Sequence, residues 1–293
     1  MKTYNSFILE NLRTGTEEIT LKDAYNIMKK NCTEFIENPM NIFKGAIIDL
    51  KHYTFDSKKF NRPPSSESSA SLLYHWVFNN SKYWQDYPKR SEAIIGSLSV
   101  LTAQGYGDSV FNVIPFDGSN WGICPEPDIW TSFDNRIDDL IDFTNDIDNY
   151  VKLEFKFHFA THTFTNFIEI LKSVNKENFV EGNLEPRYED LVLILLETKK
   201  NLYDVVEELL RPNMNNFMHL EYDEMFINFG EDKTSPYKLR QYGREVWTDS
   251  KCLYIPRVEK KDYKTNKEIS DFMVLLRKLG VDEDKIKLLQ QIY

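Results

Sequence analysis

The stretch "YPKRSEAIIGSLSVLTAQGYGDSVFNVIPFDG", residues 87–118, carries the strongest signal for the fold. Its runs "EAIIGSLS" and "SVFNVIP" have the length and the apolar content of two strands. The segment "VLTAQGYGD" between them predicts one helical turn closed by glycines. The stretch therefore predicts two strands of a sheet, with serine hydroxyls that either line a ligand site or face solvent.

Toward the N-terminus, residues 16–37 place apolar side chains at helical spacing behind a threonine with a glutamate close after it. This pattern predicts a capped amphipathic helix that ends at Asn38-Pro39. The run "IFKGAIIDL", residues 42–50, predicts a strand. After a serine-rich linker, "SASLLYHWVFNNSKYW" predicts a helix with aromatic anchors, whose rings suit a buried face or an oligomer interface equally well.

Beyond residue 118, "WGICPEPDIWTSF" predicts irregular backbone because it holds two prolines in close sequence. From about residue 135 the pattern becomes helical, although "VKLEFKFHFATHTF" alternates like a strand. Strands return at "EMFINFG" and "EVWTDSKCLYIPRV", and the end predicts two short helices broken at Gly280. We therefore expect an α+β protein in three parts: residues 1–134, an acidic helical insertion at 135–214, and residues 215–293.

The composition favours a folded, acidic protein that does not bind nucleic acid directly. Apolar residues make up 41% of the 293 residues, and 46 acidic against 36 basic residues give a net charge of −10. The odd, widely spaced cysteines form neither a disulfide framework nor a zinc motif, so we expect inert core thiols and a cytoplasmic protein. They are Cys32, Cys124 and Cys252. No apolar run predicts export or a membrane span.

Two polar patterns have ordinary explanations. His158 and His162 are four residues apart, but no third ligand is marked, so we expect no metal site. The acidic run in the helical block lacks the glycine of a calcium loop. It reads either as the solvated face of a helix or as a stripe that mimics phosphates toward a basic protein groove. The run is Asp134, Asp138, Asp139, Asp142, Asp146 and Asp148.

The opening stretch also resembles the core of ADP-ribosyltransferase-fold proteins, particularly divergent members in bacteriophages. That family carries an arginine on a first strand, Ser-Thr-Ser on a second and Glu-x-Glu ahead of a late strand. In "GSLS", Ser97 and Ser99 match the serine positions and Leu98 stands for the threonine. In "IFKGAII", Lys44 stands where the arginine is expected, and a compact ammonium lacks the planar fork of an arginine.

In "YGREVWTD", Glu245 resembles the last glutamate of the family motif, whereas Gly243 occupies the place of the first. The resemblance implies an ADP-ribosyltransferase-like split β-sheet core with a helical insertion and flanking N- and C-terminal helices. It further implies that Glu245 would be catalytic and that Ser97 and Ser99 would place the nicotinamide ribose of NAD. Lys44 or Arg90, or Arg62, would replace the missing arginine.

Three hypotheses about function stay open. The first is an NAD-dependent mono-ADP-ribosyltransferase that modifies a host protein. The second is a virus-encoded protein without a cofactor, whose degraded site leaves it to bind and inhibit a host protein, for example a nuclease complex of an anti-phage defence system such as Gabija. The third is a structural component, for which the sequence offers neither repeats nor heptads. The loss of two of four cooperating side chains favours the second hypothesis.

Overall fold

The computed structural model describes residues 15–59, 69–133, 140–157, 163–230, 243–257 and 270–290. The chain divides into two compact units, each built from segments that are distant in sequence. Unit 1 comprises residues 1–63, 87–128 and 218–293, and unit 2 comprises residues 64–86 and 129–217. Unit 2 contains the whole of the predicted acidic helical block, residues 135–214, and adds the helix that follows the serine-rich linker.

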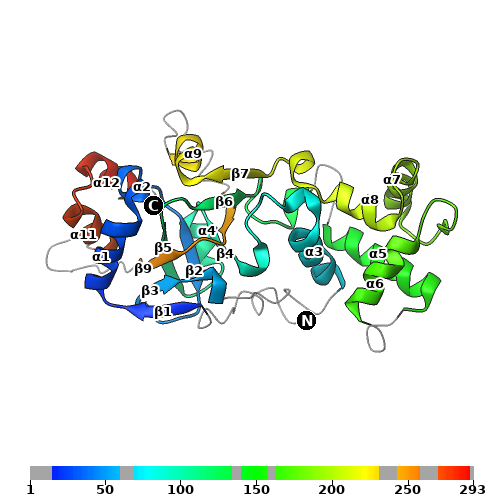
Figure 1. The fold of residues 1–293 in the computed structure, drawn as a ribbon, viewed down its shortest axis with the longest axis horizontal. Coiled ribbons are helices and arrows are strands. Elements are labelled where there is room, and N and C mark those ends of the chain that lie inside the picture. The colour runs from blue at the N-terminus through cyan, green and yellow to red at the C-terminus, as the bar shows by residue number, and fades with distance from the viewer. Residues whose placement is uncertain are drawn as a thin grey trace. The chain divides into compact units, whose positions relative to one another are not determined.

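Within the described residues, unit 1 holds an antiparallel sheet of nine strands in the order β1-β3-β9-β5-β2-β4-β8-β6-β7. Most of these strands are labelled in Figure 1. The strands are β1 (Thr16–Ile19), β2 (Phe43–Ala46), β3 (His52–Phe55), β4 (Ile94–Ser97), β5 (Ser109–Pro115), β6 (Asn120–Ile123), β7 (Met218–Glu221), β8 (Glu245–Thr248) and β9 (Cys252–Pro256). Every residue of β5 is buried, which agrees with its nearly continuous apolar sequence. Strands β2 and β4 are joined by one residue pair, Phe43 opposite Ser97.

The helices of unit 1 begin and end at recognisable signals. They are α1 (Leu21–Asn31), α2 (Thr33–Glu37), α4 (Val100–Gln104), α9 (Tyr222–Met225), α11 (Asp271–Lys278) and α12 (Glu283–Gln290), with shorter turns at Ser57–Lys59, Arg90–Glu92 and Phe226–Gly230. Thr20 and Asp23 form a capping box at the start of α1. Gly280 has a φ of +79°, so it takes the left-handed conformation that separates α11 from α12.

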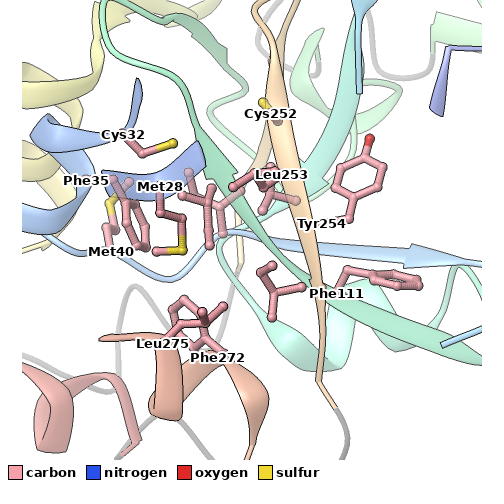
Figure 2. Close-up of a cluster of buried hydrophobic side chains, with 14 of the residues drawn as sticks. Met28, Cys32, Phe35, Met40, Phe111, Cys252, Leu253, Tyr254, Phe272 and Leu275 are labelled. Atoms are coloured by element: carbon pink, nitrogen blue, oxygen red, sulfur yellow. The ribbon is translucent and has the colours of Figure 1, made fainter. Parts of the chain in front are cut away.

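The main core of unit 1 lies where helices pack on the sheet. Side chains of α1, α2 and α11 gather beside β9, where Met28, Phe35 and Phe272 lie near Leu253 (Figure 2). All four are at most 1% exposed. Burying side chains of this size stabilises the fold by about 1.5–3 kcal/mol each, so this cluster fixes the helices to the sheet.

Unit 2 is helical. Its helices are α3 (Ser69–Asn80), α5 (Leu140–Phe155), α6 (Phe164–Ser173), α7 (Pro186–Leu196) and α8 (Leu202–Leu209), with shorter turns at Lys82–Trp84, Thr131–Phe133 and Pro212–Asn215. The aromatic anchors around α3 are largely buried within this unit, since the rings of Phe78 and Trp84 stack at 4.0 Å between centroids. The structure therefore places these rings on a packed helix face.

Two expectations about local structure are wrong at the junctions of elements. Residues 16–19 form β1 because they pair with β3 along their whole length, so the predicted helix starts only at Leu21. Residues 151–155 continue α5, because Val151 falls on the buried side of that helix although the sequence alternates. The rest of that alternating segment, with His158 and His162, lies outside the described residues.

Two further expectations are corrected near β6 and β7. The run "EMFINFG" is helical, because the side chains of Glu221 and Glu224 form a capping box at the start of α9. Residues 121–123, the start of the segment expected to be irregular, belong to the regular strand β6. Gly122 makes this strand possible, since a Cβ there would lie 2.2 Å from the ring of Trp247 on β8.

Candidate functional site

The structure brings the serine strand and the glutamate strand together. Strand β4 lies between β2 and β8, and Ser97 pairs with Phe43 on one side and with Glu245 on the other. Residues directly opposite on antiparallel strands point to the same face of a sheet. Ser97 and Glu245 therefore share one face, although almost 150 residues separate them in sequence.

Glu245 forms a buried ion pair with Arg90. The Arg90 Nη2 lies 2.7 Å from the Glu245 Oε1, and the two side chains are only 5% and 6% exposed. Arg90 belongs to the short helical turn that precedes β4, and it reaches across to Glu245 at the start of β8. A pair of opposite charges at this depth compensates most of the cost of removing each from water.

Aromatic rings hold the arginine in place. The guanidinium carbon of Arg90 lies 5.0 Å from the ring centroid of Trp247, which is fully buried. The Trp247 indole Nε1 donates to the carbonyl of Pro88 at 2.9 Å, and its ring stacks on Tyr87 at 6.0 Å. Arg90 is therefore enclosed by a carboxylate and an aromatic face, and its position is fixed by several elements of unit 1.

Both serine hydroxyls have partners in the protein. The Ser97 Oγ donates to the carbonyl of Gly243 at 3.1 Å and accepts from the backbone N–H of Ser99 at 3.0 Å. The Ser99 Oγ accepts from the backbone N–H of Thr102 at 3.4 Å and caps the start of α4. These bonds give the Ser-Leu-Ser segment a structural role in turning the chain from β4 into α4.

Gly243 is packed directly against the serine segment. A Cβ at this position would lie 1.9 Å from the Cβ of Ser99 and 2.7 Å from its backbone nitrogen. The close approach explains the glycine, because any side chain would force the backbone of Ser99 to move. The position that carries the first glutamate of the family motif is thus sterically closed in this chain.

Lys44 is not brought together with the other predicted site residues. It follows Phe43 on β2, and successive side chains of a strand point to opposite faces. Since Phe43 shares the face of Ser97, Lys44 lies on the opposite face of the sheet, where it is 4% exposed. Arg62, the other predicted replacement, lies outside the described residues.

Two residues near Glu245 carried no functional prediction. The Cys124 Sγ lies 3.8 Å from the Glu245 Oε1 and donates toward it, and the Cys124 backbone N–H donates to the Glu245 carbonyl at 2.9 Å. The pKa of the Tyr106 phenol is raised, chiefly by burial and next by the charge of Glu245. Tyr106 lies in the Gly-Tyr-Gly turn of the opening stretch. No local sequence signal marks Cys124, because its contact with Glu245 depends on the pairing of β6 with β8.

The remaining polar predictions lie elsewhere or outside the described residues. All three cysteines are buried and free, and the described residues contain no group of three or more His, Cys, Asp or Glu placed to hold a metal. Of the acidic run, Asp142 lies on the exposed face of α5, 3.6 Å from the Arg187 Nη2, whereas Asp148 is buried and paired with Lys152. The run is therefore not uniformly solvated. Its members Asp134, Asp138 and Asp139 fall outside the described residues.

No family model, curated protein or solved structure matches this chain. The ADP-ribosyltransferase-like core therefore stays a prediction, while the mixed helical and antiparallel architecture is observed. None of the helices in the described ranges combines the length and apolar character that crossing a bilayer requires.

Proposed function

We propose that this protein acts by binding and inhibiting a host protein and that its transferase-like site performs no NAD chemistry. The observation that carries the proposal is the buried pair of Arg90 and Glu245. In the reaction that the resemblance implies, the arginine would hold the NAD diphosphate and the glutamate would accept a hydrogen bond from the ribose. Here the two charges compensate each other, so neither is presented to a ligand.

The distribution of charge supports a basic partner. Unit 2 contains 19 Asp and Glu against 10 Lys and Arg, so it carries −9 of the total charge of −10. On its helices, Leu153 is 64% and Ile194 is 67% exposed, which adds apolar contact area within an acidic surface. Complementary charge accelerates and orients protein association. The acidic charge of unit 2 and the resemblance to bacteriophage proteins together favour one kind of target, a host defence nuclease of the Gabija type. The DNA-binding surface of such a nuclease would be basic.

The binding proposal is tested by mixing the purified protein with the purified nuclease complex and measuring complex formation and DNA cleavage. The variant Glu177→Lys/Asp190→Lys reverses two exposed charges on unit 2, and Glu17→Lys/Glu37→Lys makes the same change on unit 1. We expect the first variant to weaken binding and inhibition at least about tenfold and the second to leave both nearly unchanged. Absence of any complex would remove this target, and equal loss in both variants would remove the charge argument.

One observation keeps a second candidate, an active mono-ADP-ribosyltransferase. Ser97 and Glu245, which match the second and third elements of the family motif, lie on neighbouring strands and share a face of the sheet. This activity predicts NAD consumption by the wild-type protein in the presence of a protein acceptor, and its loss in Glu245→Gln. If the wild type consumes no NAD, or if Glu245→Gln consumes it at the same rate, this candidate fails.

A further inference from the structure

Unit 1 contains a cavity whose lining includes neither Arg90 nor Glu245. It has a volume of about 310 Å³ and is lined by residues 47–49 after β2, by Tyr53 of β3, by residues 108–109 at the start of β5, and by Thr16 of β1. Small-molecule sites begin at about this volume. The cavity therefore has room for a small organic molecule or a single long side chain.

Hydrogen bonds between different elements fix the walls of this cavity. The Ser109 Oγ donates to the carbonyl of Ile48 at 2.7 Å, and Ser109 is 8% exposed. The Tyr53 hydroxyl donates to the carbonyl of Asp49 at 3.2 Å. Because these bonds tie the loop after β2 to β3 and to β5, the cavity is formed before any ligand binds, which reduces the entropy lost on binding.

The lining combines two carboxylates with apolar surface. Asp49 and Asp108 are both exposed, and within the described part of the chain neither carboxylate makes an ion pair. The nearby Lys51 directs its ammonium to Glu18 at 2.8 Å, and the charge of Asp49 contributes less than Glu18 to raising the pKa of Lys51. Ile47 is 53% exposed, and together with Ile48 and the ring of Tyr53 it provides an apolar wall.

We propose that this cavity binds an organic cation, namely a guanidinium or primary ammonium group on an alkyl chain. The carboxylates of Asp49 and Asp108 would accept charge-assisted hydrogen bonds from the cation, and Ile47, Ile48 and Tyr53 would cover the alkyl chain. A metal ion is disfavoured, because the described residues contain no group of three acidic, histidine or cysteine side chains that could hold one. An anionic ligand would be repelled by both carboxylates.

Titration calorimetry with agmatine and spermidine tests the proposal, with butanol and succinate as uncharged and anionic controls. We expect saturable one-to-one binding of at least one of the two cations and none of the controls. The variant Asp49→Asn/Asp108→Asn keeps the shape of both side chains and should weaken binding about tenfold or more. The matched variant Glu177→Gln/Asp190→Asn removes two exposed charges from unit 2 and should bind as the wild type does.

The peptide Gly-Arg-Gly distinguishes a free cation from a protein side chain as the natural source of this chemistry. If the peptide binds as tightly as agmatine, the cavity accepts an arginine of a protein; if only agmatine or spermidine binds, it accepts a free amine. Absence of saturable binding for all three, or equal weakening in both double variants, would overturn the proposal. The result is independent of the proposed inhibitory function, since it requires neither a nuclease nor NAD.

Discussion

At the scale of single residues, the pair of Arg90 and Glu245 places two charges almost completely out of reach of solvent in unit 1. Replacing Glu245 by glutamine leaves the Arg90 guanidinium charged, buried and without its carboxylate, which we expect to lower the free energy of unfolding by about 3–5 kcal/mol. Urea unfolding measures this loss. The double variant Arg90→Met/Glu245→Leu removes both charges and should be more stable than Glu245→Gln. A double variant less stable than the single one would show that the charges themselves stabilise the fold.

Gly243 allows a second prediction at this scale. Because a Cβ there would lie 1.9 Å from the Cβ of Ser99, Gly243→Ala should destabilise unit 1 by about 1–3 kcal/mol, the usual cost of overpacking. The double variant Gly243→Ala/Ser99→Gly removes the clashing atom and should regain part of that loss, after allowing for the lost cap of α4 in a Ser99→Gly control. Urea unfolding of the four proteins forms a cycle. Strict additivity of the two changes would contradict the predicted contact.

At the scale of elements, His52 links β3 to α11, because its Nε2 lies 3.3 Å from the Asp271 Oδ2. Burial lowers the pKa of His52, and the charge of Asp271 opposes this shift only in part. The unfolded chain therefore takes up the proton more readily than the folded one, so stability is full above the ordinary pKa of histidine, about 6.5, and falls as the pH drops below it. Removing the opposing charge in Asp271→Asn should increase this acid sensitivity.

The measurement is the urea midpoint between pH 7 and pH 5 for the wild type, Asp271→Asn and His52→Asn. We expect the midpoint to fall most in Asp271→Asn and least in His52→Asn, which lacks the titrating ring. Other histidines contribute equally to all three proteins and cancel in the comparison. The prediction fails if Asp271→Asn loses no more stability than the wild type over this range.

Sequence patterns identified the helices and strands that have strong local signals. They missed elements that form only through pairing with another strand or through a capping contact. The apolar run of β5 and the helical character of residues 21–31 were predictable from their apolar patterns, whereas the break at Cys32 between α1 and α2 was not. Strand β1 was not, because Thr16–Ile19 becomes a strand only through its pairing with β3. The apolar residues of "EMFINFG" predicted a strand after β7. The capping box formed by Glu221 and Glu224 instead stabilises the start of a helix there.

At the scale of the whole molecule, the sequence could not show how the predicted site residues combine. The resemblance indicated Ser97 and Glu245 as site residues, and the pairing of β4 with β8 brings these two residues together. The contact of Glu245 with Arg90, and the placement of Lys44 on the opposite face, depend on strand register and order, which no local pattern contains. The division into two units likewise joins segments far apart in sequence.

The uneven charge of the two units predicts different responses to salt. Unit 2 carries −9 and unit 1 about −1, so self-repulsion opposes folding mainly in unit 2. Raising sodium chloride from about 0.01 M to about 1 M shortens the screening length from about 30 Å to about 3 Å. We therefore expect amide hydrogen exchange in α5–α8 to slow about fivefold, corresponding to about 1 kcal/mol, while exchange in β5 and β9 changes little.

Exchange followed by mass spectrometry resolves both units in one sample, so unit 1 serves as the internal control for general effects of salt. The variant Glu177→Gln/Asp190→Asn reduces the net charge of unit 2 and should lessen its response to salt. Ion pairs within unit 2, such as Lys176 with Glu197 at 2.5 Å, weaken with screening and oppose the effect. If exchange in α5–α8 accelerates with salt, these pairs outweigh the net repulsion, and the acidic surface stabilises unit 2 even without a basic partner.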